Sequence, residues 1–471
     1  MPSLRVLLPP EAAPAPSYDD LRRELEVPGE FPPDVLAEAA RSAAAPRLPD
    51  VDLTDVPFLT VDPPGSRDLD QAMALSRRPG GYRLHYAIAD VAAFVTPGGA
   101  LDAECARRGE TLYLPDRRTP LHPPVLGEDA ASLLEGQTRP AVVWTLDLDA
   151  DAEPVSTTVR RALVRSRRRL DYEGVSRDLD AGTADDGLAL LREVGLLRQE
   201  SARARGAIDL PTPEQEVTTG PDGPRLAFRA QLPAEGWNAQ ISLLTGMAAA
   251  RLMLDGRVGL LRTLPPADAE AVASLRRSAL ALGLPWEEGT PHGAVISALD
   301  PTVPAAAALL TLATRVLRGA AYTPFDGTVP EQAGHSAVAA PYAHCTAPLR
   351  RLADRYVSEV CLAVSAGREV PDWARSALPL LPDLMSAADR RAHALERAVV
   401  DLAEAVVLAP HVGQVFDAVV VESGVKGGAV QLSDPAVRAR CEGADLPLGQ
   451  RVSVVLAGAD PVSRTVRFRL A

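Results

Sequence analysis

Residues 59–90 read LTVDPPGSRDLDQAMALSRRPGGYRLHYAIAD and carry two strand-turn-strand patterns in succession. The second pattern places Arg-Pro-Gly-Gly between QAMALSRR and YRLHYAIAD, which is typical of a β-hairpin. In its second segment Tyr82, Leu84, Tyr86 and Ile88 alternate with other residues, the period of a half-buried strand. The stretch therefore predicts a sheet near the start of the folded region.

The first pattern places three aspartates around a Pro-Pro-Gly turn. FLTV, residues 58–61, predicts a short strand that ends just before Asp62, and an extended segment would direct Asp68 and Asp70 to one face. Three carboxylates that converge in this way are oxygen ligands of the kind that Mg²⁺ prefers. Solvated acidic turns have the same composition, so the spacing is consistent with either a metal site or a solvated turn.

Composition limits the classes of protein to which the chain can belong. The 471 residues predict two or three domains, and 46% hydrophobic with 24% charged residues is typical of a soluble globular protein. No run of 18 apolar residues predicts a transmembrane helix, and the N-terminal apolar segment is too short for a secretory signal. The four cysteines contain no C-x-x-C, which argues against a zinc cluster or a disulfide framework. We therefore expect a cytoplasmic protein without a membrane partner.

One segment is strongly basic although the net charge is −13. Residues 157–170, TTVRRALVRSRRRL, hold six arginines between Arg160 and Arg169. The net charge argues against general binding of polyanions, but local charge decides whether a nucleic acid binds. The arginine run is consistent either with a solvated face or with a guide for a phosphate backbone.

A second basic motif lies in HSAVAAPYAHCTAPLRRLADRYVSEV, residues 335–360, where Arg350 and Arg351 open a predicted helix. Cations at a helix N-terminus oppose the helix dipole, so a nearby anion such as a phosphate would explain them. Pairing with surface acids such as Asp354 is the more common arrangement.

The order of patterns predicts three segments and an α+β fold. Two short helical patterns occupy residues 1–48, and a mixed region of strands followed by helices occupies residues 49–408. Residues 409–471 contain short alternating strands with glycine turns, which indicate a small β-barrel. We expect a mixed α/β domain between a short helical segment and this barrel.

Several motifs, in order, resemble the ribonuclease II (RNB) family. VDPPGSRDLDQAM resembles the family's metal-binding motif, and HYAIADVAAFV its next strand. Four further segments are similar to family motifs in the same order: RRGETLYLPDRRTPLHPPVLGEDAASLLEGQTRPAVVWTLDLD, RRRLDYEGV, RGAIDLPTPE and YAHCTAPLRRLADRYV. The final segment resembles the S1 RNA-binding domain, so the resemblance covers residues 49–471. The resemblance implies that residues 49–408 form an RNB catalytic domain and that the barrel of residues 409–471 is an OB-type S1 domain.

The resemblance implies a processive, hydrolytic 3′→5′ exoribonuclease that degrades single-stranded RNA to nucleoside 5′-monophosphates with Mg²⁺. Asp70 would be the carboxylate closest to the chemistry, and Arg350 would stabilise charge on the scissile phosphate. Tyr113 would stack on bases near the 3′ end, and Tyr172 would position the reacting nucleotide. We expect the protein to be a monomer. The implied residues are Asp62, Asp68 and Asp70 as metal ligands, Asp70, Arg350 and Tyr172 as catalytic residues, and Tyr113, Arg350, Arg351 and Arg167 as RNA-binding residues.

The chain departs from the family pattern at several positions. The family's fourth aspartate is Gln71, whose amide oxygen would coordinate a metal only weakly. An alternative is therefore a catalytically weakened RNA-binding homologue that keeps the fold. The other departures are Ala239 and Gln240 for an acidic pair, Gly246 for an asparagine, Leu210 for a stacking phenylalanine and Leu352 for a tyrosine.

The segment before the catalytic region is short for this family. Family members commonly carry two cold-shock domains there, and 48 residues cannot contain even one such barrel. We expect a helical segment in their place and looser discrimination against structured RNA.

Overall fold

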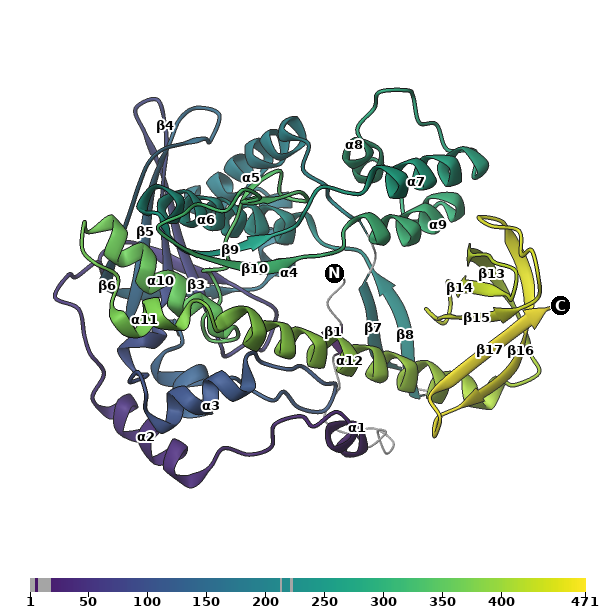
Figure 1. Cartoon of the computed structure of the whole chain (residues 1–471), viewed down its shortest axis with the longest axis horizontal. Coiled ribbons are helices and arrows are strands. Elements are labelled where there is room, and N and C mark those ends of the chain that lie inside the picture. Colours follow the sequence, from purple (N-terminus) through teal and green to yellow (C-terminus); the bar gives the residue numbers. More distant parts are fainter. Residues whose placement is uncertain (1–4, 7–17, 212–213, 221–222) are drawn as a thin grey trace.

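The structure is a computed structural model that describes residues 5–6, 18–211, 214–220 and 223–471. Figure 1 shows a large body and a smaller C-terminal barrel, connected by a long helix. The large body contains a closed barrel of five strands in the order β2-β3-β4-β5-β6. These strands are β2 (Phe58–Val61), β3 (Gln71–Arg78), β4 (Gly81–Ala89), β5 (Thr138–Leu148) and β6 (Pro154–Leu170).

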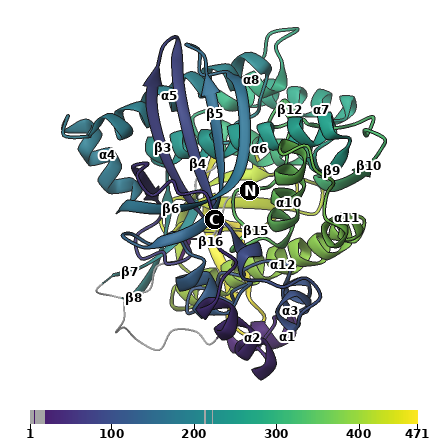
Figure 2. The ribbon, with the colours of Figure 1, turned by 90° about the vertical axis from the view of Figure 1, so that its left-hand side faces the viewer.

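The predicted hairpin forms the centre of this barrel. Strands β3 and β4 pair antiparallel from Gln71–Ile88 to Arg78–Gly81, so Pro79 and Gly80 make the turn. Gly80 has φ +79°, a conformation that glycine adopts without a steric penalty. In the view of Figure 2, β3, β4 and β5 lie side by side, with α4 (Tyr172–Asp180) on one side and α10 (Leu352–Ser365) on the other.

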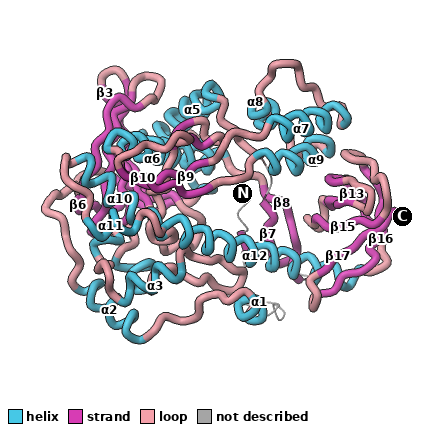
Figure 3. Tube along the Cα trace, in the orientation of Figure 1, coloured by secondary structure: helices cyan, strands magenta, loops and turns pink. Residues whose placement is uncertain are grey.

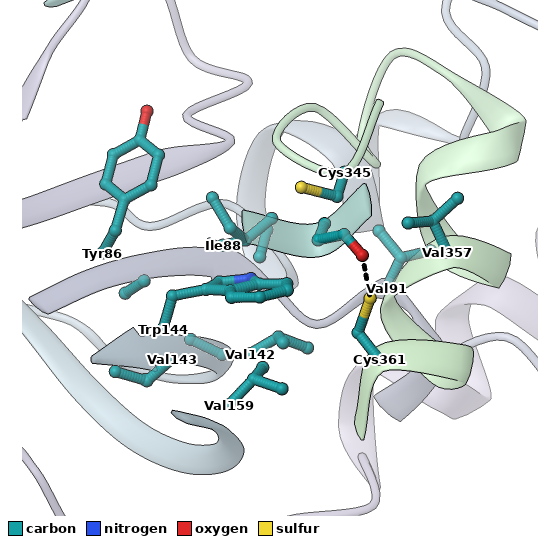
Figure 4. Close-up of a cluster of buried hydrophobic side chains, with 14 of the residues drawn as sticks. Tyr86, Ile88, Val91, Val142, Val143, Trp144, Val159, Cys345, Val357 and Cys361 are labelled. Carbon is teal, nitrogen blue, oxygen red and sulfur yellow. Dashed lines mark hydrogen bonds between the residues drawn. The ribbon is translucent and has the colours of Figure 1, made fainter. Parts of the chain in front are cut away.

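Trp144 on β5 lies at the centre of the main hydrophobic core and is fully buried. Figure 4 shows its indole among Ile88, Val142 and Val159, with Val357 of α10 nearby. Helix α10 packs against β6, and α5 packs against β3. Because helices cover the barrel, β4 is buried on both faces from Tyr86 to Ala89, whereas its outer end alternates as the sequence predicts.

The remaining helices lie on several sides of this barrel, and α7, α8 and α9 lie toward the C-terminal barrel at the upper right of Figure 1. Helices α1 and α2 precede the barrel, as expected for the N-terminal segment. The helices are α1 (Asp19–Glu24), α2 (Pro33–Ala44), α3 (Ala100–Arg108), α5 (Asp186–Arg205), α6 (Pro233–Gly256), α7 (Ala269–Ala281), α8 (His292–Ser297), α9 (Pro304–Ala313) and α11 (Asp372–Ala377). None of the helices in the described ranges is long and apolar enough to cross a membrane.

Helix α12 (Leu381–Leu408) connects the large body to a second closed barrel of strand order β13-β14-β15-β17-β16. Phe468 is fully buried inside this barrel. Figure 3 shows the two barrels at opposite ends of the molecule, with shorter strand pairs between them. The strands of the second barrel are β13 (Val415–Glu422), β14 (Gly428–Leu432), β15 (Arg438–Glu442), β16 (Arg451–Asp460) and β17 (Thr465–Leu470).

The α+β fold class is confirmed, and the differences from expectation are local. The arginine run lies on a strand, because β6 continues through it to Leu170. Three small sheets were not predicted, and the boundaries at residues 48/49 and 408/409 stay predictions. The small sheets comprise β1 (Arg5–Val6), β7 (Glu214–Gly220) and β8 (Gly223–Arg229), then β9 (Val258–Thr263) with β10 (Ala321–Asp326), and β11 (Gly334–His335) with β12 (Ala340–Pro341).

Candidate functional site

The three predicted aspartates lie at one edge of the first barrel. Asp62 directly follows β2, and Asp68 and Asp70 lie between the Pro-Pro-Gly turn and β3. Leu69 between them is fully buried and its N–H donates to Ser132 Oγ at 2.9 Å. Leu69 therefore anchors the segment between the two aspartates to the core.

Asp70 is held by a segment that lies 280 residues away in sequence. Its Oδ1 accepts the Leu349 N–H at 2.7 Å, and its Oδ2 accepts Arg350 Nε at 3.0 Å. The residue is 3% exposed. Burial raises the pKa of Asp70 to about 7, although Arg350 and the Leu349 N–H favour the ionised form. The structure thus brings the predicted carboxylate and the predicted arginine into direct contact.

Asp68 contacts two residues of the loop between α3 and β5. Tyr113 Oη donates to Asp68 Oδ2 at 3.2 Å, and Arg118 forms an ion pair with Asp68 Oδ1. Arg118 also pairs with Glu128 at 2.8 Å. Tyr113 is 46% exposed, so its ring remains accessible beside the aspartates.

Asp62 belongs to the same electrostatic environment. Burial raises the pKa of Asp62 to about 6, and the charge of Asp68 acts in the same direction. Arg350 and Arg169 oppose this increase. Since Asp68 also raises the pKa of Asp70, the three carboxylates are electrostatically coupled.

The aspartates have the right donor chemistry for Mg²⁺, but their side chains are not arranged as a metal site. In the part of the chain that the structure describes, no group of three or more His, Cys, Asp or Glu side chains is placed to hold a metal ion. Asp68 is bound by Arg118, and both oxygens of Asp70 accept hydrogen bonds from the Leu349–Arg350 segment. The arrangement seen here is one of carboxylates paired with arginines.

Tyr172 lies close to this cluster at the first turn of α4. Asp171 caps the helix, and its side chain accepts the Gly174 N–H at 2.7 Å. Burial, followed by the charge of Asp62, raises the pKa of Tyr172 to about 12. Asn238 Nδ2 donates to Tyr172 Oη at 3.2 Å and orients the hydroxyl.

The other two predicted RNA-binding arginines have protein partners. Arg351 donates through Nε and Nη2 to Asp354 at 3.0 and 2.8 Å, the pairing that the sequence offered as the alternative to phosphate. Arg167 is exposed and donates to the backbone oxygen of Asp55 at 2.5 Å. Their contacts with RNA stay predictions. On β6 it is Arg169, two residues after Arg167, whose charge lowers the pKa of Asp62 together with that of Arg350.

Three residues near the aspartates were not predicted as site residues: Arg118, Arg169 and Asn238. Arg169 belongs to the arginine run, so the sequence indicated its charge, but it did not indicate that Asp62 would lie near it. Arg118 and Asn238 show no periodic or spacing signal that would assign them to Asp68 and Tyr172. Their contacts depend on how distant segments meet.

Gln71 has its amide engaged by the protein. Its Oε1 accepts the Tyr86 hydroxyl at 2.7 Å, and its Nε2 donates to the Thr346 carbonyl at 2.6 Å. Gly246, where the family has an asparagine, packs so tightly that an added Cβ would lie 2.2 Å from Tyr342 Cε2. The packing of this chain therefore matches its departures from the family pattern.

Comparisons with protein families cover most of the chain. The RNB domain model matches residues 50–365, and the model of the RNase II-type exonuclease C-terminal S1 domain matches residues 414–471. Exosome complex exonuclease RRP44 homolog A of Arabidopsis thaliana is 32% identical over 333 residues, 67% of this chain and 35% of that protein. Ribonuclease R of Thermotoga maritima is 26% identical over 443 residues, 88% of this chain and 62% of that protein. The chain thus spans 35% and 62% of the lengths of these two relatives.

Solved structures show the same fold. Mycoplasma genitalium RNase R in complex with ribose-methylated single-stranded RNA superposes with a TM-score of 0.85 at 20% identity, covering 96% of this chain and 77% of that chain. Yeast Ssd1, a pseudonuclease, superposes with a TM-score of 0.66 at 18% identity, covering 88% and 52%. The family models, the motif order and the two barrels agree. The chain belongs to the RNB family and carries the S1 domain of RNase II-type exonucleases at its C-terminal side.

Proposed function

We propose that the protein is a processive 3′→5′ hydrolytic exoribonuclease that degrades single-stranded RNA to nucleoside 5′-monophosphates with Mg²⁺. The observation that carries the proposal is Asp70, held by the Leu349 N–H and Arg350 Nε in a chain of the RNB family. A carboxylate and an arginine fixed side by side are suited to phosphodiester hydrolysis, because one can bind cations or protons and the other binds phosphate.

Arg350 is the residue best placed to bind the scissile phosphate. A guanidinium has five N–H donors, so Arg350 keeps donors beyond the Nε that bonds Asp70. Its side chain is 46% exposed, which makes it accessible to RNA. When water adds to phosphorus and the P–O3′ bond breaks, negative charge grows on the phosphate oxygens. A preorganised cation at that place stabilises the transition state more than the ground state.

Single-stranded RNA is the proposed substrate because the exposed features recognise no particular sequence. The exposed ring of Tyr113 offers a stacking surface, and stacking accepts every base. Arg167 and Arg169 on β6 add positive charge that a phosphate backbone can follow. An RNase R of the same fold has been solved with single-stranded RNA.

The Mg²⁺ requirement rests on family membership and on the oxygen donors of Asp62, Asp68 and Asp70. A bound Mg²⁺ would act as a Lewis acid toward the phosphate. For Asp68 and Asp70 to serve as ligands, Arg118 and Arg350 would have to release them, at least in part.

A gel time course tests the proposal with 5′-labelled poly(A), purified protein, and either Mg²⁺ or EDTA. We expect the full-length band to convert directly to a very short 5′ oligonucleotide. EDTA and Asp70→Asn should abolish this conversion. Asp20→Asn is the matched control, because Asp20 is 79% exposed and pairs with Arg23, three residues along the chain. A ladder of internal fragments, or activity that survives Asp70→Asn, would contradict the proposal.

The second candidate is an RNA-binding homologue that does not hydrolyse RNA. It is favoured by the engaged amide of Gln71 and by carboxylates that pair with arginines. The same gel separates the two functions. An intact RNA band together with a clear mobility shift would identify the binding protein.

A further inference from the structure

A chain of hydrogen bonds begins on α6 and ends on the turn that carries Arg350. Tyr86 Oη donates to Gln71 Oε1 at 2.7 Å, and Gln71 Nε2 donates to the Thr346 carbonyl at 2.6 Å. Ser242 Oγ lies 2.8 Å from Tyr86 Oη. Because Tyr86 has one hydroxyl hydrogen, which goes to Gln71, Ser242 is the donor to Tyr86. Every bond in the chain therefore points toward Thr346.

The Thr346 carbonyl, the last acceptor in this series of hydrogen bonds, begins the segment that binds Asp70. Three residues after Thr346, the Leu349 N–H bonds Asp70 Oδ1, and Arg350 Nε bonds Asp70 Oδ2. Thr346 is 5% exposed, so its carbonyl depends on a protein partner. Gln71 directly follows Asp70 in the chain. Two adjacent residues thus hold the two ends of one short turn.

We propose that Gln71 is a positioning residue that holds the Thr346–Arg350 turn in place, and that it is not a metal ligand. The inference rests on the proposed function, in which Arg350 binds the scissile phosphate. A carbonyl oxygen only accepts hydrogen bonds, so the group opposite Thr346 has to be a donor. An amide donates and a carboxylate does not, which explains why a glutamine stands where the family has an aspartate.

A second departure from the family pattern acts on the same segment. Gly246 lies one turn of α6 beyond Ser242, and its carbonyl accepts the Ala343 N–H at 3.1 Å. A Cβ at Gly246 would lie 2.6 Å from the Ala343 carbonyl oxygen, so only glycine allows this approach. Gly246 and Gln71 therefore hydrogen-bond the backbone at Ala343 and Thr346, on either side of Cys345 and just before the residues that contact Asp70.

The two roles of Gln71 predict opposite effects of Gln71→Glu. A glutamate keeps the length and the acceptor for Tyr86, but it removes the donor to Thr346. If Gln71 were a metal ligand, the added carboxylate would bind Mg²⁺ better and lower the Mg²⁺ concentration needed for half-maximal hydrolysis. If Gln71 holds the turn, the variant leaves a buried carbonyl without its donor and lowers the rate.

The experiment compares the wild type, Gln71→Glu, Gln71→Met and Gln137→Glu. Gln71→Met removes the donor without adding charge, and it serves also if the glutamate variant folds poorly. Gln137 is exposed and remote from the turn in sequence, so Gln137→Glu controls for the added charge. Three quantities are measured: amide hydrogen exchange of Ala347, Leu349, Arg350 and Arg351 in EDTA, RNA affinity in EDTA, and the single-turnover hydrolysis rate in Mg²⁺.

We expect the amides of Ala347, Leu349, Arg350 and Arg351 to exchange about tenfold faster in both Gln71 variants, because one buried hydrogen bond is lost. The single-turnover rate should fall about 10- to 100-fold through misplacement of Arg350, with a smaller loss of RNA affinity. Unchanged exchange in both variants, or a Gln71→Glu protein that needs less Mg²⁺, would overturn the inference. If the wild type does not hydrolyse RNA, the proposed function fails, and the exchange measurement still decides whether Gln71 holds the turn.

Discussion

Replacing Arg350 with alanine removes the charge that faces Asp70, and the size of the effect follows from the geometry. Two unit charges about 4 Å apart attract by about 4 kcal/mol at the effective dielectric constant near a protein surface. Asp70 is 3% exposed, but the Arg350 side chain is 46% exposed, so water weakens this attraction. We therefore expect Arg350 to stabilise ionised Asp70 by about 1–2 kcal/mol, which corresponds to roughly one pKa unit.

The pH dependence of this stabilisation has a definite sign. Burial raises the pKa of Asp70 to about 7, and Arg350→Ala should raise it further. Below pH 6 Asp70 is protonated in both proteins, so the charge of Asp70 does not contribute to the difference between their free energies of unfolding. As the pH rises to 9, Asp70 ionises in both proteins, and its ionisation costs less free energy in the wild type because Arg350 stabilises the carboxylate. The wild type should therefore gain about 1–2 kcal/mol over the variant across this range.

The assay is urea unfolding in EDTA at pH 6 and pH 9, followed by tryptophan fluorescence, since Trp144 is fully buried in the same core. A double-mutant cycle with Asp70→Asn isolates the pair, because the arginine should lose its pH-dependent effect when residue 70 cannot ionise. Asp20 and Arg23, with side chains 79% and 76% exposed, form the control cycle and should show no coupling. A coupling energy between Asp70 and Arg350 that is equal at both pH values would refute the reasoning.

Three further predictions concern other parts of the chain. Burial raises the pKa of Glu404 to about 7, so this residue should lower the free energy of unfolding by up to about 3 kcal/mol as the pH rises from 4.5 to 7. Thermal unfolding of Glu404→Gln should show a pH slope smaller by this amount, since Asp70 and Asp62 contribute slopes of the same sign in both proteins. Tyr113→Leu should bind short single-stranded RNA about 10- to 100-fold more weakly than the wild type in fluorescence anisotropy. Tyr113→Phe keeps the stacking ring and should bind as the wild type does, and equal affinities of the two variants would exclude stacking. Phe468→Ala leaves a cavity at the centre of the second barrel and should lower the stability of this barrel by about 3–5 kcal/mol. Calorimetry should then show a separate unfolding transition at lower temperature, and a single unshifted transition would contradict the prediction.

Local patterns in the sequence were sufficient wherever the structure depends on near neighbours. The Pro-Gly turn and the alternation from Tyr82 to Ile88 predicted the β3–β4 hairpin, because both signals act within a few residues. The spacing of Asp62, Asp68 and Asp70 predicted three carboxylates that converge around one turn, because only the short segment between β2 and β3 separates them. The resemblance to the RNB family added the site residues, and the family models confirmed the family.

Only the tertiary structure decided which groups these residues meet. Asp70 is joined to Arg350 across 280 positions, and no periodicity in either segment specifies that contact. Strand β9 pairs with β10 across a long insertion of helices, so neither strand had a local partner to reveal it. Gln71 was expected to be a weakened ligand, whereas its amide bonds Tyr86 and Thr346. Spacing determines which side chains share a face, but packing determines their partners, because burial makes a hydrogen bond with a distant segment more favourable than leaving a polar group unpaired.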